Sequence, residues 1–102
     1  MGLFFDSPRP RVTPYELKLV KGILRSKYNF TEREANQVEE VFRGDIDEQK
    51  YLEKGIDTTE LVKGIEWMRS HLNVHHISPK KIDILEIEMM KKITTNTTPG
   101  IF

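Results

Sequence analysis

The sequence contains no cysteine and no long apolar run. Without cysteine the chain has no disulfide, no thiolate nucleophile and no sulfur ligand for a metal. No apolar stretch approaches the roughly 20 residues that a membrane-spanning helix requires. The short apolar group at residues 3–5 is too brief for a secretory signal. These absences predict a cytoplasmic protein with no membrane partner.

The chain also lacks an excess of charge of either sign, because 16 Lys and Arg residues balance 16 Asp and Glu residues. A protein whose main task is binding nucleic acid usually carries a clear positive excess, so no nucleic-acid partner is expected. The charges are unevenly spread, however. Residues 1–27 carry six basic and two acidic side chains, whereas residues 28–60 carry ten acidic and four basic side chains. Such asymmetry favours attraction to a partner, between regions of the fold, or between two copies.

The starts of four helices are marked by capping signals. In a capping box, an N-cap side chain accepts a backbone N–H while a glutamate three residues later bonds back. Three pairs have this spacing: Thr13 with Glu16, Thr31 with Glu34, and Asp57 with Glu60. A fourth start is Ser78 followed by Pro79, which suits the first helical position. Residues able to take the left-handed conformation that ends a helix are Asn29, Gly44 and Asn73.

Apolar residues at helical spacing support these four helices, and no alternating strand pattern competes with them. The predicted helices span residues 14–28, 32–43, 58–72 and 79–93. The sequence therefore predicts an all-α protein: a compact bundle of four short helices with a long acidic loop between the second and third. One helical domain at 13–93 is expected, flanked by flexible tails at 1–12 and 94–102.

The acidic loop carries the one pattern with a specific chemical meaning. Residues 55–61 (GIDTTEL) resemble the end of a calcium-binding EF-hand loop, in which alternate oxygen ligands precede a bidentate glutamate. The first half of the loop does not keep the family's spacing, because Lys54 stands where the family has its turn glycine. The resemblance implies a helix-loop-helix with an expanded calcium loop. Its candidate metal ligands are Asp45, Asp47, Glu53, Asp57 and Glu60.

The same acidic residues have a second explanation that involves no ion. Asp57 and Glu60 form the capping box of the third helix, and Asp45 and Asp47 suit a solvated turn after Gly44. We therefore expect no cofactor, with calcium as the alternative. His71 and His75 are four residues apart, as in a zinc site, but no third ligand is evident. No arrangement of residues predicts catalysis, so a non-enzyme is expected.

Two apolar groups fall outside the predicted core stripes and indicate partner binding. Gly64, Trp67 and His71 recur at helical spacing on one face of the third helix. A glycine inside a helix often marks close approach, either by a partner or by another helix of the same chain. Ile84 and Ile87 lie off the main stripe of the fourth helix. We expect a small non-catalytic interaction module or homodimer, the alternative being a degenerate EF-hand-like calcium-binding protein.

Overall fold

A computed structural model describes residues 10–47 and 54–97, with side chains placed as far as Thr95. This part of the chain contains six helices and one isolated backbone pairing, so the predicted all-α class is confirmed. The helices are α2 (Pro14–Tyr28), α3 (Glu32–Val41), α4 (Arg43–Ile46), α5 (Thr58–Ser70), α6 (Leu72–His75) and α7 (Pro79–Thr97). None of these described helices combines the length and apolar character needed to cross a bilayer.

The helix starts lie where the capping signals place them. Thr13 and Thr31 head α2 and α3, each with both hydrogen bonds of a capping box. At the start of α5, Oδ1 of Asp57 accepts the N–H of Glu60 at 2.8 Å, and Oε1 of Glu60 accepts the N–H of Asp57 at 2.9 Å. Ser78 accepts a backbone N–H in the first turn of α7 at 3.2 Å. Each cap satisfies backbone donors that would otherwise lack a partner and stabilises its helix by about 1 kcal/mol.

Two of the three predicted helix ends differ in the structure. Asn29 ends α2 in the left-handed conformation, as expected, with φ of 62°. Gly44 and Asn73 do not end helices, because each lies inside a short additional helix, α4 or α6. The left-handed position after α6 belongs instead to His76, with φ of 58°. The predicted second and third helices therefore end early, at Val41 and Ser70, and a short helix follows each after one residue, Phe42 or His71.

The predicted tails also need correction. The last helix continues to Thr97, so residues 94–97 are helical. At the other end, Val12 is fully buried and exchanges two backbone hydrogen bonds with Ile56, of 2.8 and 2.9 Å. Gly55 has φ of +115°, and a Cβ there would lie 2.7 Å from the carbonyl oxygen of Val12. Glycine thus allows the segment before α2 to pair with the entrance to α5. Residues 1–9 and 98–102 lie outside the described part of the chain.

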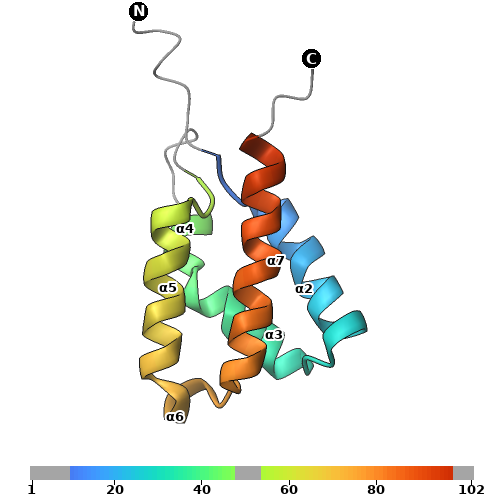
Figure 1. Cartoon of the computed structure of the whole chain (residues 1–102), viewed down its shortest axis with the longest axis vertical. Helices are drawn as coiled ribbons and strands as arrows, with labels where there is room; N and C mark the ends of the chain where they lie inside the picture. The colour runs from blue at the N-terminus through green and yellow to red at the C-terminus, as the bar shows by residue number, and fades with distance from the viewer. Residues whose placement is uncertain (1–9, 48–53, 98–102) are drawn as a thin grey trace, which may run out of the picture.

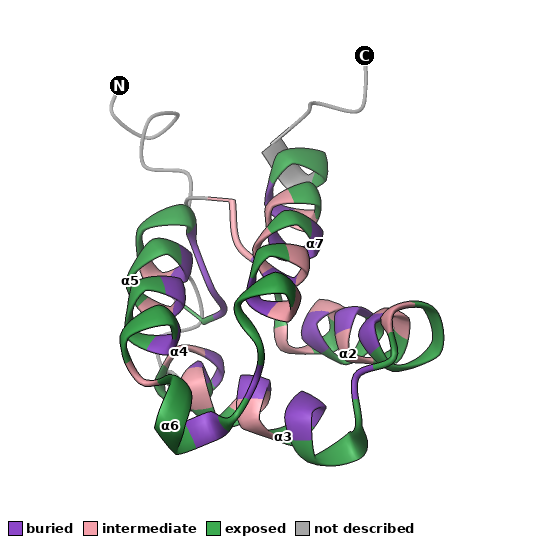
Figure 2. Cartoon of the chain, turned by 60° about the horizontal axis from the view of Figure 1, so that its bottom comes forward, coloured by how far each residue is buried: buried purple, intermediate pink, exposed green. Residues whose placement is uncertain are grey.

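Helix α7 is central in the arrangement, because it packs against both α5 and α2. Helix α3 packs against α2 and passes behind α7 in the view of Figure 1. The sides of the helices that face inward are buried and their outer sides are exposed (Figure 2).

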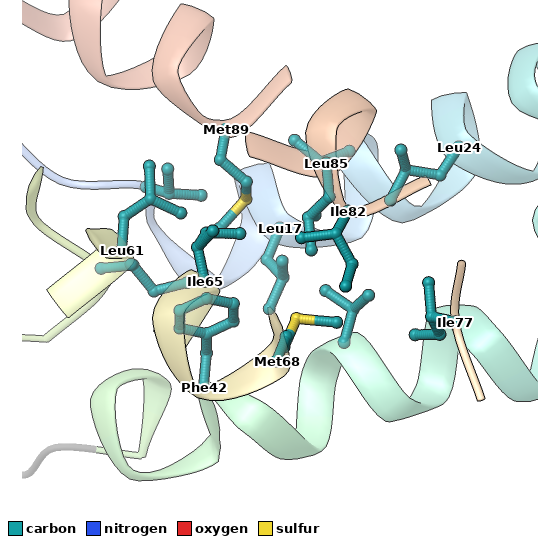
Figure 3. Packing of buried hydrophobic residues seen from close by; sticks show 14 of the residues in the cluster. Leu17, Leu24, Phe42, Leu61, Ile65, Met68, Ile77, Ile82, Leu85 and Met89 are labelled. Atoms are coloured by element: carbon teal, nitrogen blue, oxygen red, sulfur yellow. The ribbon is translucent and has the colours of Figure 1, made fainter. Parts of the chain in front are cut away.

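A single apolar cluster joins α2, α3, α4, α5 and α7, and Figure 3 shows most of its members. Its buried residues are Val12, Leu17, Val20, Leu24, Phe30, Val38, Phe42, Ile46, Ile56, Leu61, Ile65, Met68, Ile77, Ile82, Leu85, Met89 and Ile93. Burying apolar surface is the main stabilising contribution to such a fold, at about 25 cal/mol per Å².

Candidate functional site

A groove of about 440 Å³ lies between α5 and the junction of α3 with α4. Its apolar lining comes from Val41, Phe42, Gly64 and Trp67. We refer to this feature as the Trp67 groove. Two of the residues predicted to bind a partner, Gly64 and Trp67, line it.

Gly64 allows the two walls of the groove to approach each other. A Cβ at this position would lie 2.3 Å from Cε1 of Phe42, far inside van der Waals contact. Phe42 is buried, and its ring packs in the same cluster as Ile65 (Figure 3). The close approach expected at Gly64 is thus made by an aromatic side chain of the same protein. Beyond that ring the groove remains open toward Trp67.

Trp67 stands at the groove with 41% of its surface exposed. Its indole stacks on the imidazole of His71, with ring centroids 4.3 Å apart and planes 13° from parallel. Nδ1 of His71 lies 2.7 Å from the carbonyl oxygen of Trp67, which fixes the imidazole against the helix end. The indole is therefore held in one orientation although much of it faces solvent. His71, the third residue predicted on this face, acts as its support.

His75 is a structural residue in the turn after α5. It is fully buried; Nε2 donates to the carbonyl oxygen of Met68 at 2.7 Å, and Nδ1 accepts the N–H of Ile77 at 2.9 Å. Both ring nitrogens are thus engaged with the backbone. The zinc-like spacing of His71 and His75 therefore does not offer two available nitrogens, because His75 uses both of its own for backbone hydrogen bonds. His76 closes α6 as its C-cap.

Three carboxylates proposed as metal ligands, Asp45, Asp57 and Glu60, interact electrostatically at the entrance to α5. Arg11 approaches two of them: Nη1 lies 3.1 Å from Glu60, and Nη2 lies 3.7 Å from Asp57. The guanidinium group therefore supplies a positive charge next to this cluster.

Of the other two proposed metal ligands, Asp47 is exposed, and Glu53 lies outside the described part of the chain. Among residues 10–47 and 54–97, no three His, Asp or Glu side chains are arranged to hold a metal ion. The physical reason is that Asp57 and Glu60 direct oxygens to the backbone N–H groups of their capping box. These oxygens neutralise a helix terminus instead of converging on one point.

Asp45 lines the groove and is partly buried. Burial raises the pKa of its carboxyl group to about 6, and the nearby Glu60 and Asp57 carboxylates add to this effect, while Arg11 opposes it. The charged form of Asp45 is thus disfavoured by the surrounding protein. A cation placed in the groove would lower the pKa of Asp45 and so favour its charged form.

The rim of the groove is predominantly acidic. Glu40, Asp45 and Glu60 line it, against Lys63 alone among basic residues. Arg43 pairs with Glu40 at 2.6 Å on the exposed side, so part of this charge is already compensated. The groove thus combines an apolar floor and an aromatic wall with negative charge at its edge.

The second predicted partner surface is only partly present. Ile84 is half-buried and packs against the core, so only part of it reaches the surface. Ile87 is 55% exposed on the outer side of α7. It adjoins a shallow depression of about 520 Å³ lined also by Met90, Lys91, Thr94 and Thr95.

Sequence patterns did not identify all the residues of the groove. No sequence pattern points to Phe42 as part of a site, and Asp45 is predicted only in the acidic loop. Arg11 was placed in a tail. Helical spacing relates residues of one helix, whereas these side chains reach the site from different segments.

No family model matches the sequence, and neither curated proteins nor solved structures show significant similarity to it.

Proposed function

We propose that this protein is a small, non-catalytic interaction module that binds a segment of another protein in the Trp67 groove. The observation that carries the proposal is a half-exposed tryptophan held in place by His71 beside a preformed apolar floor. Tryptophan is enriched among the residues that dominate binding energy, and a fixed side chain loses little conformational entropy on binding. A cytoplasmic setting is part of this proposal and accords with the absence of cysteine.

The proposed partner segment carries an apolar side chain next to lysine or arginine. The apolar side chain would contact Trp67 and the floor formed by Phe42 and Val41. The basic side chain would lie against the acidic rim, where Glu40 and Asp45 outnumber the single Lys63. Complementary charge raises the association rate and selects against acidic partners.

Trp67 is the single tryptophan of the chain, so its fluorescence reports directly on the groove. The test titrates the full chain with a synthetic peptide that alternates leucine with lysine, and with a matched peptide that alternates leucine with glutamate. We expect the lysine peptide to shift the emission in a saturable way and the glutamate peptide to have much less effect. Equal responses to both peptides would contradict the charge-based part of the proposal.

Two substitutions assign the response to the groove. Trp67→Ala should abolish binding of the lysine peptide when amide NMR shifts replace fluorescence as the measurement. Tyr15→Ala removes an even more exposed aromatic side chain from α2 and should leave binding unchanged. Lys63→Glu should tighten binding because it removes the one basic side chain at the rim. Binding that survives Trp67→Ala would place the interaction elsewhere on the protein.

A further inference from the structure

The outward-facing side of α7 carries a row of three residues at four-residue spacing, which follows a natural ridge of the helix surface. Asp83 and Lys91 form its ends, with side chains 60% and 62% exposed, and Ile87 forms its centre with 55% exposed. Along the helix, the row therefore presents a negative charge, an apolar side chain and a positive charge in that order. We call it the α7 ridge.

We propose that two copies of this chain associate through the α7 ridge, packed antiparallel about a two-fold axis at Ile87. A two-fold axis reverses the direction of the row, so that Asp83 of one copy meets Lys91 of the other, twice in each dimer. Ile87 of each copy packs on its equivalent. A parallel pairing would instead bring like charges together, so the charge order selects the antiparallel one.

The residues beside the ridge obey the same symmetry. Ile84 and Met90 lie three residues to either side of Ile87, and both are half-buried against the core with a part left at the surface. The two-fold axis places Ile84 of one copy level with Met90 of the other, on the opposite side of the ridge, so that these two apolar side chains flank the central pair. The shallow depression lined by Met90, Lys91 and Thr94 leaves room for side chains of the second copy.

The charged ends of the ridge already have contacts within the chain, which position them without covering them. Nη1 of Arg69 lies 2.7 Å from Oδ1 of Asp83, and Nζ of Lys91 lies 3.0 Å from Oε2 of Glu88. Both ridge side chains nevertheless remain more than half exposed. A second copy would therefore extend existing ion pairs, at little additional cost in side-chain entropy.

The proposed interface is small. One face of a single helix falls near or below the roughly 1,200 Å² of total buried area that stable interfaces require. A weak dimer, with a dissociation constant in the micromolar range or above, is therefore expected. The Trp67 groove lies on the side of α5 that faces α3 and α4, so both grooves of the dimer would stay accessible. This inference does not depend on what the groove binds.

Sedimentation equilibrium of the full chain, from micromolar to millimolar concentration, tests the proposal. We expect the average mass to rise with concentration from that of the 12.0 kDa chain toward that of a dimer. Ile87→Glu should keep the protein monomeric, with an unchanged helical circular dichroism spectrum. Val74→Glu changes another exposed aliphatic residue, on α6, and should dimerise like the original chain. A chain that stays monomeric throughout, or an Ile87→Glu variant that still dimerises, would overturn the proposal.

Charge exchange tests the antiparallel geometry independently. Asp83→Lys and Lys91→Glu should each weaken self-association by about tenfold, because each replaces two attractive contacts by repulsive ones. The double variant should recover association, since it exchanges the two ends of the ridge. Mixing the two single variants should give a heterodimer tighter than either homodimer. A double variant as weak as the single ones would rule out the antiparallel pairing.

Discussion

One side of α5 faces α7 and the other faces the junction of α3 with α4, and the two contacts differ in chemistry. Toward α7, the core stripe is bordered by Arg69, which bridges Asp83 at 2.7 Å and Glu86 at 2.9 Å. Toward the junction, Gly64 receives the ring of Phe42, and Trp67 remains uncovered. The border with α7 consists of exposed ion pairs, whereas the contact with the junction depends on steric fit. Substitutions should therefore affect stability much more at the junction of α3 with α4.

The largest effect is expected for Phe42→Ala. Phe42 is among the largest fully buried side chains, and it fills the space left by Gly64. Its removal should lower the free energy of unfolding by about 3 to 5 kcal/mol, through lost burial and the cavity left behind. Urea denaturation followed by circular dichroism measures this change. A loss below about 1 kcal/mol would mean that the junction collapses around the missing ring.

Gly64→Ala should have the next largest effect on the free energy of unfolding. The added methyl group would overlap the Phe42 ring, and overpacking of this kind costs about 1 to 3 kcal/mol. In helix α2, Gly22 has no neighbouring atom within 4 Å of the added carbon. Gly22→Ala is therefore the matched control and should stabilise by up to about 1 kcal/mol, because alanine favours helix more than glycine does.

A double-mutant cycle shows whether the Phe42 ring causes the cost. In a Phe42→Ala background, Gly64→Ala should no longer destabilise and should instead stabilise, since only the helix preference remains. A cost at Gly64 that persists in this background would point to a different neighbour.

Asp45→Asn should increase stability at neutral pH. Since the pKa of Asp45 is raised to about 6 in the folded state, its usual value being 3.8, the folded state binds the proton more tightly than the unfolded state. Stability should therefore fall as the pH rises from about 4 to 6, and the asparagine variant should not show this loss. At pH 7 the gain should be roughly 1 to 2 kcal/mol after allowance for solvent screening.

The pH dependence separates this effect from a general preference for asparagine. Near pH 3 the carboxyl group is protonated in both states, so the variant and the original chain should have similar stabilities. Asp47→Asn is the control because Asp47 is exposed and close in sequence, and it should change stability little at any pH. A gain at Asp45 that is equal at low and neutral pH would contradict the ionisation account.

The smallest effect is expected at the border of α5 with α7. Arg69→Met should lower the free energy of unfolding by at most about 1 kcal/mol, because the ion pairs are exposed to solvent. High salt should reduce the difference further. Thermal unfolding at low and high salt measures it. A larger loss that is independent of salt would show that the methylene groups of Arg69 contribute through packing.

The features that could be predicted from the sequence are those determined by neighbouring residues. Asp57 and Glu60 specify a helix start through hydrogen bonds three residues apart, so this start was predicted correctly. Gly44 and Asn73 were wrongly predicted to end helices because a tendency toward the left-handed conformation is weak. The helices break at Phe42 and His71 instead. Phe42 turns its own ring into the core, and the turn that follows His71 buries His75.

The groove was predictable only on the α5 side. Gly64 and Trp67 share a helix face, which their spacing reveals. The opposite wall depends on how closely α3 and α4 approach α5, and no local sequence pattern predicts that distance. The reduced acidity of Asp45 likewise arises from burial and from carboxylates that approach it in the fold. The exposed position of Ile87 was predicted, whereas the partial burial of Ile84 depends on how α7 packs between two helices.

The pairing of Val12 with Ile56 has a consequence for the order of folding. Two hydrogen bonds there connect segments 44 residues apart and enclose α2, α3 and α4 in one loop. Closing such a loop costs chain entropy that grows with its length, whereas α5 and α7 are joined by a much shorter connection that contains α6. The segment before α2 should therefore dock late and detach first, and the amide protons of Val12 and Ile56 should exchange with solvent together as that loop opens.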